Sequence, residues 1–404
     1  MTPGVEVALL VAERLQTVDR VASAVRETSA SNPPAGWVWQ DHATASGFAG
    51  LAVLFGCLAR CRPDEGWDRA AHEHLMASVE AAKRARSLPL GLATGLGGLA
   101  FTALLLAGDG HRYVRLRQAL DEKMGPGVSM LAGRLRDDRQ PACQDVDVIS
   151  GAAGVLSYLL ARPERDRLAK LRSDLLAAAA GCVIEYRLPR RPGAGVDLGL
   201  AHGVAGLVAA LAVAHRQGVG GPAVAEGLRT GASWLLARRS ADQWGATWAR
   251  EDPPARAAGA THAAWCYGAP GVARSLLLAG AALGDPALTE AALAAFEGVC
   301  RRPDHERHLV SPTFCHGHAG LAHLLHQTAV ETGRGELRAE AHRLLNLVAA
   351  GFDSSTAFGY RAGHRGGSAV DSPGLLDGAA GVALVLLSAA SAGLPAWDRL
   401  FLVQ

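Results

Sequence analysis

The sequence has little of what marks a secreted, membrane-spanning or nucleic-acid-binding protein. Its seven cysteines are an odd number scattered over 404 residues, which argues against a disulfide framework of the secreted type. Forty basic and 38 acidic residues leave a formal net charge of only +2, so no global field gathers nucleic acid or an anionic membrane. No apolar run approaches the roughly eighteen residues that a membrane-spanning helix needs. We therefore expect no nucleic-acid partner and no membrane span.

The N-terminal stretch also lacks the features of a signal peptide. Glu6, Glu13 and Asp19 interrupt its apolar residues, and no basic region precedes them. We interpret residues 1–40 as an N-terminal helical segment. The chain is expected to be cytoplasmic, with its thiols reduced.

What the sequence does have is apolar material rich in Ala, Leu and Gly, with 49% hydrophobic residues in all. This composition suits helices better than strands. Length alone suggests two or three domains. An internal repeat overrides that estimate and predicts a single domain over residues 1–404.

The repeat consists of two glycines three residues apart, with a small or polar segment before them and an apolar run of about ten residues after. It occurs seven times: SGFAGLAVLFGCLA from Ser46, TGLGGLAFTALLLA from Thr94, SGAAGVLSYLLA from Ser150, HGVAGLVAALAVA from His202, YGAPGVARSLLLAG from Tyr267, HGHAGLAHLLH from His316 and DGAAGVALVLLSA from Asp377. The intervening segments carry apolar residues at helical spacing with charges on the other face. Each repeat therefore predicts an amphipathic outer helix followed by an inner helix that is apolar all round.

An inner helix that is apolar all round must be covered on every side. A closed ring of seven inner helices inside seven outer ones covers them all, whereas an open solenoid needs polar capping repeats that neither end provides. The predicted fold is therefore all-α, an α/α toroid of seven helix pairs.

The glycines themselves need no catalytic explanation. Glycine supplies backbone freedom at a helix start and lets neighbouring helices approach closely. The TGLGG stretch at Thr94 superficially resembles a phosphate-binding loop, but no strand precedes it and the motif recurs six more times. A nucleotide site is rejected.

Function should lie where the repeats differ, at the residues just before the glycines. Ser46 and Thr94 read as ordinary N-cap residues. The fourth, fifth and sixth repeats instead have His202, Cys266 and the pair Cys315-His316. Two thiolates and an imidazole suit a zinc site with one open position. We expect Cys266, Cys315 and His316 to be its ligands.

Alternative assignments of these histidines and cysteines remain open. His202 is either a fourth ligand or an acid/base group beside the metal. His318 and His323 compete with His316 within CHGHAGLAHLLH and rank below it. The cysteines outside the special position read as buried small hydrophobes; these are Cys57, Cys61, Cys143, Cys182 and Cys300.

Three motifs resemble the signatures of the lanthionine synthetase C-like family, in the family's order. They are GLAHGVAG from Gly199, WCYGAPG from Trp265 and CHGHAG from Cys315, on repeats that run from about Ser46 to the C-terminus. The resemblance implies an α/α toroid with zinc near its central cavity. It also implies that Cys266, Cys315 and His316 bind the zinc.

The resemblance assigns further roles around the metal. His202 would be an acid/base residue and Tyr267 a cavity neighbour, and DVISGAAGVLSYLL makes Asp147 the matching acidic residue of the third repeat. From the sequence alone Asp147 could equally cap its helix. Some cyclases of the family have an arginine four residues before the motif cysteine, where this chain has His262, which can donate a hydrogen bond without being permanently charged.

The implied function is that of a stand-alone lanthipeptide cyclase. Zinc would activate cysteine thiols of a dehydrated precursor peptide for addition to dehydroalanine or dehydrobutyrine, and His202 would protonate the resulting enolate. A separate dehydratase is implied, because no dehydratase or kinase region is present. The stretch RLPRRPG from Arg187 to Gly193 could bind an acidic leader segment, although a solvated surface explains most such runs.

Three alternatives to the cyclase remain. One is a non-catalytic relative that holds a thiol ligand such as glutathione on zinc. Another is a different α/α-toroid enzyme; paired carboxylates, as in glycosidases, are not what the special positions carry, but a zinc-dependent prenyl transfer to a thiol is harder to exclude. The third is a helical scaffold with structural cysteines.

Overall fold

The computed structural model describes residues 2–31, 33, 37–108, 110–163, 166–190, 195–254, 262–363, 369–391 and 397–404. The chain forms two compact units. Unit 1 comprises Met1–Leu88, Ala93–Gln118 and Leu309–Trp397, and unit 2 comprises Pro89–Leu92, Ala119–His308 and Asp398–Gln404. The single domain expected over residues 1–404 stays a prediction.

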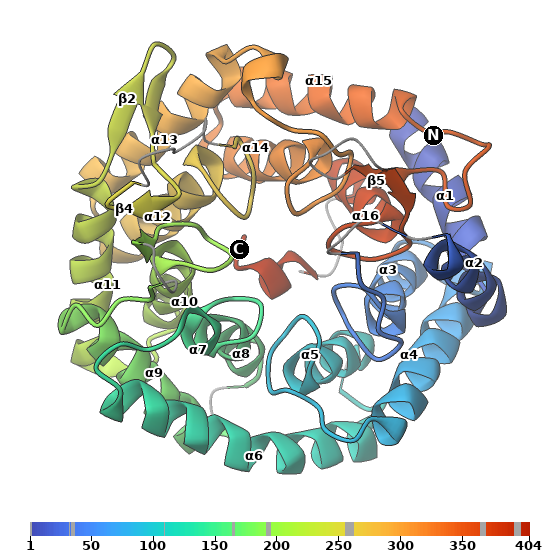
Figure 1. Cartoon of the computed structure of the whole chain (residues 1–404), viewed down its shortest axis with the longest axis horizontal. Helices are drawn as coiled ribbons and strands as arrows, with labels where there is room; N and C mark the ends of the chain where they lie inside the picture. Colours follow the sequence, from blue (N-terminus) through green and yellow to red (C-terminus); the bar gives the residue numbers. More distant parts are fainter. Residues whose placement is uncertain are drawn as a thin grey trace. The chain divides into compact units, whose positions relative to one another are not determined.

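Unit 1 is helical apart from one short pair of strands (Figure 1). Strands β5 (Arg361–Gly363) and β6 (Ala369–Asp371) pair antiparallel. Its helices are α1 (Pro3–Leu15), α2 (Val18–Ala30), α3 (Phe48–Cys61), η1 (Pro63–Glu65), α4 (Trp67–Arg84), α5 (Leu96–Leu106), α14 (His318–Thr332), α15 (Gly335–Ala350) and α16 (Ala379–Ala390).

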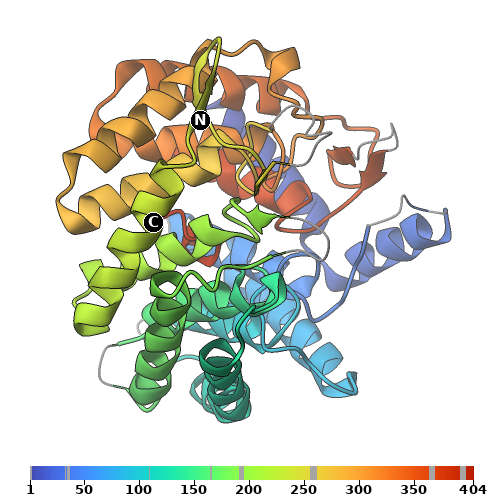
Figure 2. The ribbon, with the colours of Figure 1, turned by 60° about the vertical axis from the view of Figure 1, so that its left-hand side comes forward.

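Unit 2 contains most of α6 and the helices from α7 to α13. They are α6 (Val114–Asp137), α7 (Cys143–Val146), α8 (Ala152–Leu160), α9 (Ala169–Ile184), α10 (Val204–Arg216), α11 (Gly221–Leu236), α12 (Ala269–Leu283), α13 (Pro286–Arg301) and η2 (Asp304–Glu306). Antiparallel strand pairs are formed by β1 (Val196–Asp197) with β4 (Glu251–Asp252) and by β2 (Ser240–Asp242) with β3 (Gly245–Thr247). The β2–β3 hairpin packs on α13 (Figure 2).

All seven predicted inner helices are present and begin at the Gly-x-x-Gly motifs: α3, α5, α8, α10, α12, α14 and α16. The inner helices are covered on every side, as their apolar sequences require. Every residue from Phe48 to Leu58 in α3 and from Ala379 to Leu387 in α16 is buried. In unit 2, α9, α11 and α13 pack on α8, α10 and α12. In unit 1, α4 packs on α3, α15 on α14, and the first helix, α1, on the last inner helix, α16.

The prediction that Ser46 and Thr94 cap their helices was wrong. The N-cap positions of α3 and α5 are Gly47 and Gly95, and neither helix has a side-chain cap bond. The preceding loop folds back over the helix start and supplies main-chain carbonyls in place of a side chain. The first amide of α3 donates to Asp41 O at 3.0 Å, and the first amides of α14 and α16 donate to Ser311 O and Ser372 O at 2.9 Å.

The same loop explains the second glycine in six of the seven motifs. A Cβ atom built on Gly320 would lie 1.8 Å from Phe314 O, and one on Gly154 would lie 2.0 Å from Val148 O. The equivalent glycines Gly50, Gly206, Gly271 and Gly381 meet the carbonyl six residues earlier at 2.0–2.5 Å. The glycines therefore make room chiefly for the helix's own preceding loop, and less for the neighbouring helices that the sequence suggested.

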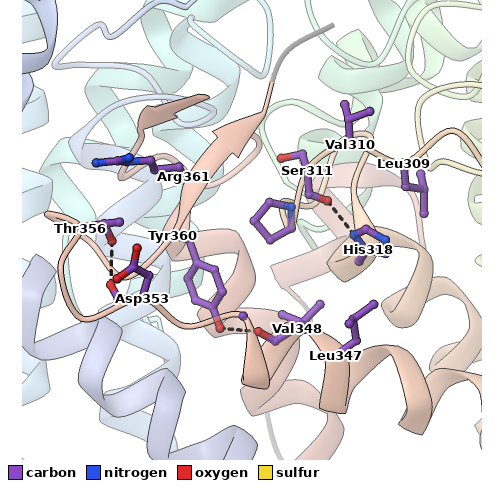
Figure 3. A pocket seen from close by; sticks show the side chains of 12 residues that line it. Leu309, Val310, Ser311, His318, Leu347, Val348, Asp353, Thr356, Tyr360 and Arg361 are labelled. Carbon is purple, nitrogen blue, oxygen red and sulfur yellow. Dashed lines mark hydrogen bonds between the residues drawn. The ribbon is translucent and has the colours of Figure 1, made fainter. Parts of the chain in front are cut away.

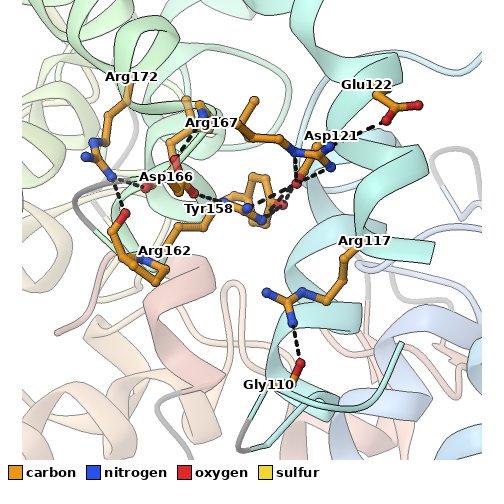
Figure 4. A network of polar contacts seen from close by, with 12 residues as sticks. Gly110, Arg117, Asp121, Glu122, Tyr158, Arg162, Asp166, Arg167 and Arg172 are labelled. Carbon is orange, nitrogen blue, oxygen red and sulfur yellow. Dashed lines mark hydrogen bonds and ion pairs between the residues drawn. The ribbon is translucent and has the colours of Figure 1, made fainter. Parts of the chain in front are cut away.

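A buried polar network ties α6 to α8 and to the loop that follows α8 in unit 2 (Figure 4). Asp121 of α6, only 2% exposed, accepts from the Tyr158 hydroxyl at 2.5 Å and pairs with Arg162 and Arg167 at 3.0 Å each. Burial raises the pKa of Tyr158 above its usual range, and the hydroxyl stays protonated as the donor. None of the predicted site residues belongs to this network.

Among the described residues, no helix is both long enough and apolar enough to cross a membrane.

Candidate functional site

The loops before the inner helices are joined to one another by main-chain hydrogen bonds. In unit 1, Cys315 N donates to Leu376 O at 3.0 Å, Leu376 N to Ala45 O at 3.0 Å, and Ala45 N to Ala93 O at 2.9 Å. Each of these four residues lies two positions before the first glycine of its motif. The predicted special positions are therefore in register within this unit.

Unit 2 repeats the arrangement on its own three loops. Val148 N donates to Ala201 O at 3.0 Å, and Ala201 N donates to Cys266 O at 3.3 Å. Ala201 and Cys266 again lie two residues before the first glycine. The main chain thus fixes Cys266 beside the loop that carries His202, because Ala201 precedes that histidine.

His202 and Asp147 form a hydrogen-bonded pair in unit 2. His202 Nδ1 lies 2.7 Å from Asp147 Oδ2, and the Asp147 side chain is almost fully buried. An ionised carboxylate only accepts, so the proton of this bond belongs to Nδ1. The side chain of His202 is 35% exposed, and its Nε2 atom is the ring nitrogen that could exchange a proton with a substrate.

The other oxygen of Asp147 caps the loop before α8. Oδ1 accepts from Ser150 N at 2.7 Å and from Gly151 N at 2.9 Å. The two readings that the sequence left open, capping and assistance to a histidine, are therefore both compatible with the geometry. Each uses a different oxygen of the same carboxylate.

Tyr267 is a neighbour of both His202 and an arginine, Arg250, that the sequence did not predict. The centroid of its ring is 6.0 Å from that of His202. The guanidinium carbon of Arg250 lies over the same tyrosine ring, 4.4 Å from its centroid. Arg250 Nη2 is also 3.4 Å from the Tyr267 hydroxyl. Arg250 lies between β3 and β4, outside the repeated motif, so no sequence signal pointed to it.

His316 in unit 1 has a carboxylate neighbour. Its Nδ1 atom lies 3.5 Å from Asp377 Oδ1. Histidines that bind metals commonly use one ring nitrogen for the metal and the other for a carboxylate, which fixes the ring. Asp377 was missed, although a signal existed: it directly precedes the first glycine of the seventh repeat, the position of His202, Tyr267 and His316 in theirs.

Cys266, Cys315 and His316 form a candidate metal site among the described residues. Cys266 is buried, and Cys315 and His316 are partly buried. Two thiols and an imidazole are the donor set of tetrahedral zinc sites with a fourth position open. The donor chemistry, together with Asp377 behind His316, fits zinc.

Three other predicted histidines have contacts of their own. His262 has its ring 6.3 Å from that of His308. His323, a competitor of His316, is a core residue that is 1% exposed and packs against Trp397 with ring centroids 5.1 Å apart. His318 Nδ1 is 3.1 Å from Ser311 O. These positions favour His316 over His318 and His323 as a ligand.

The side chains of Cys182 and Arg187 both donate hydrogen bonds to main-chain carbonyls at the end of α6. Burial raises the pKa of the Cys182 thiol to about 11, and its sulfur donates to Leu135 O at 3.3 Å. The Arg187 guanidinium donates to main-chain carbonyls at the end of α6, including Asp138 O at 2.8 Å. The remainder of the proposed leader-binding stretch, from position 191 to Gly193, lies outside the described residues.

A pocket of about 450 Å³ opens in unit 1 beside the loop before α14 (Figure 3). Val310, Leu347 and Tyr360 form part of its wall, and His318 with its Ser311 contact stands on one side. None of the predicted metal ligands lines this pocket.

Comparison with known proteins identifies the family to which the sequence is similar. The family model described as lanthionine synthetase C-like protein matches residues 38–402. The nisin biosynthesis protein NisC of Lactococcus lactis subsp. lactis is 27% identical over 255 residues. That match covers 57% of this chain and 60% of NisC, less than two thirds of its length.

A solved structure titled nisin cyclase superposes with a TM-score of 0.76 at 18% sequence identity, covering 96% of this chain and 98% of that one. This likeness shows the shared fold and confirms the predicted all-α toroid class. Because the family model spans nearly all of the sequence, the chain belongs to the lanthionine synthetase C-like family.

Proposed function

We propose that the protein is a zinc-dependent lanthipeptide cyclase, which adds cysteine thiols of a dehydrated precursor peptide to dehydroalanine or dehydrobutyrine and so forms thioether rings. The observation that carries the proposal is the candidate metal set Cys266, Cys315 and His316 in a chain of this family. The names of the matched relatives, a nisin biosynthesis protein and a nisin cyclase, support the same activity.

In this proposal three protein side chains hold the zinc and leave its fourth position for the substrate. Bound there, zinc would lower the pKa of a substrate thiol, so that the nucleophilic thiolate predominates near neutral pH. Cys266 and Cys315 would bind as thiolates and keep the substrate sulfur electron-rich. Asp377 would orient the His316 ring for this role.

His202 is the proposed general acid. Addition of sulfur to the β-carbon leaves an enolate, which must gain a proton at the α-carbon. Asp147 accepts from Nδ1 and so orients Nε2 toward the substrate, and its negative charge stabilises the protonated ring. The thiol S–H bond breaks and its proton is released, the sulfur forms a C–S bond, and the alkene π pair moves to the enolate. His202 then donates a proton to the α-carbon and regains one afterwards, so that the number of protons is unchanged overall.

Tyr267 and Arg250 would add polar contacts beside His202. The guanidinium of Arg250 lies over the Tyr267 ring in a cation–π contact. His262 is proposed as a hydrogen-bond donor to the peptide. We further propose a cytoplasmic location, a single domain over the chain, and a separate dehydratase that supplies the substrate.

The proposal is tested on the purified protein and a dehydrated peptide that contains cysteine. Zinc content is measured by metal analysis, and ring formation by the loss of free substrate thiol without a change in mass. Cys315→Ala is compared with Cys61→Ala, a half-buried cysteine at the end of α3 outside the candidate site. We expect bound zinc and cyclisation in the wild type and in Cys61→Ala, and neither in Cys315→Ala.

Each other result has a definite meaning. Zinc without cyclisation points to a protein that binds a thiol ligand, and transfer of a prenyl group to the thiol would identify a different alkylating enzyme. Absence of zinc from the wild type would reject the metal site itself.

A further inference from the structure

The residue before each candidate cysteine ligand is aromatic, and the equivalent residue of every other repeat is not. Three positions before the first glycine, the fifth and sixth repeats have Trp265 and Phe314. The other repeats have Thr44, Leu92, Val148, Leu200 and Leu375. All seven are buried. At this position, large rings are thus confined to the two repeats that have a candidate cysteine ligand.

Trp265 in unit 2 is held by the C-terminal segment. The indole is fully buried, its Nε1 donates to Phe401 O at 3.0 Å, and its ring meets the Phe401 ring edge-on at 5.3 Å. The carbonyl of Trp265 faces Gly271, whose Cβ would lie only 2.2 Å away. Side chain and main chain of the residue before Cys266 are therefore both fixed.

Phe314 in unit 1 has an equivalent partner. Its ring meets that of Trp397 edge-on at 5.6 Å, and Trp397 Nε1 donates to Ser388 Oγ of α16 at 2.9 Å. Trp397 and Phe401 are the first and last residues of one short helix, η3 (Trp397–Phe401). Figure 1 marks the end of this segment with C.

Side chains of α8 and α12 also hold η3 and the residues after it. Arg274 of α12 is fully buried and its Nε donates to Val403 O at 2.6 Å, while Ser157 of α8 donates to Arg399 O at 2.8 Å. Burying an arginine is costly unless its donors are satisfied. Here part of that requirement is met by the main chain of this segment.

We propose that Trp397 and Phe401 are positioning residues for the two cysteine ligands, Trp397 acting on Cys315 through Phe314 and Phe401 acting on Cys266 through Trp265. A metal site of few protein ligands depends on how rigidly each ligand is held, because loosening a supporting residue lowers metal affinity about 10- to 100-fold. The inference rests on the proposed zinc site.

The test compares Trp397→Leu and Phe401→Leu with Phe296→Leu, a fully buried phenylalanine of the outer helix α13. Zinc affinity is measured by competition with a chromophoric chelator, and thermal unfolding reports stability. We expect affinity to fall about tenfold in the first two variants, and to stay within about twofold in the control at a similar loss of stability. Equal affinity in all three, or an equal fall in all three, would overturn the inference.

A second measurement needs no metal. In the zinc-free protein, alkylation with iodoacetamide followed by peptide mass spectrometry should show Cys266 modified severalfold faster in Phe401→Leu and Cys315 faster in Trp397→Leu. A general loss of structure would expose both cysteines in both variants, and that pattern would refute the positioning role. If the wild type binds no zinc, the proposed cyclase site fails, and the alkylation pattern still decides whether the two residues position the cysteines.

Discussion

Replacing Asp147 by asparagine separates its two tasks. The cap needs an oxygen acceptor for the amides of Ser150 and Gly151, at 2.7 and 2.9 Å, and the amide oxygen of asparagine can supply it. The bond to His202 needs an acceptor with a negative charge to stabilise the imidazolium, and the asparagine side chain is neutral. The variant should therefore fold normally and catalyse poorly.

The expected magnitudes follow from these contacts. General acid–base catalysis is worth about 10²–10⁴ in rate, so we expect kcat/KM to fall about 10²- to 10³-fold, or about 3 to 4 kcal/mol of barrier. Since the cap survives, unfolding free energy should change by less than about 1 kcal/mol. Asp147→Ala removes the cap as well and should cost about 1 kcal/mol more in stability.

The assay records initial rates of substrate thiol loss at one pH, alongside urea unfolding. Asp145→Asn is the matched control: it lies two residues away and forms a partly exposed ion pair with Arg134 at 2.7 Å, a kind worth little in stability. Its rate should equal that of the wild type. If Asp147→Asn keeps more than about a third of the wild-type rate, the role assigned to the Asp147–His202 pair is wrong.

Three further predictions concern the fold. Gly320→Ala places a Cβ 1.8 Å from a main-chain carbonyl and should cost about 3 kcal/mol, whereas Gly335→Ala, with nothing within 4 Å, should stay within about 0.5 kcal/mol; urea unfolding distinguishes them. Burial lowers the pKa of His74 to about 4, so the unfolded chain binds a proton that the folded chain does not. Stability should then fall by about 3 kcal/mol as pH drops from about 6.5 to 4, and His74→Asn should flatten that dependence. Cys182, with its pKa raised to about 11, should resist iodoacetamide in the folded protein at pH 8, and its modification there, detected by mass spectrometry, would contradict its burial.

The sequence predicted the inner helices well because the signal was local and repeated. A Gly-x-x-Gly motif followed by an apolar run marked all seven starts. The caps at Ser46 and Thr94 failed for a physical reason: the acceptors are carbonyls of residues such as Ser311, seven positions before the amide they serve. An N-cap rule considers only the adjoining side chain and cannot detect such a loop.

In the candidate site, too, residues within the repeat could be predicted and residues outside it could not. Asp377 could have been found by comparing the residue before the first glycine in all seven repeats, because that column also contains His202 and His316. Arg250 could not, since it reaches Tyr267 from a loop outside the repeat. The contact of Phe401 with Trp265, beside Cys266, could not be predicted either, because a contact between residues 136 positions apart leaves no periodic pattern in the sequence.

The packing of α1 on α16 has a consequence for synthesis of the protein. Unit 2 is built almost wholly from one continuous stretch, Ala119–His308, whose helices mostly contact their neighbours in sequence. Unit 1 joins helices that are far apart in the sequence, and α1 can gain its partner α16 only after all the helices between them have left the ribosome. Contacts of such long sequence separation form slowly. Until then the faces of α1 and α3 that α16 covers stay open to water, so these helices are exposed to aggregation for longer than the helices of unit 2.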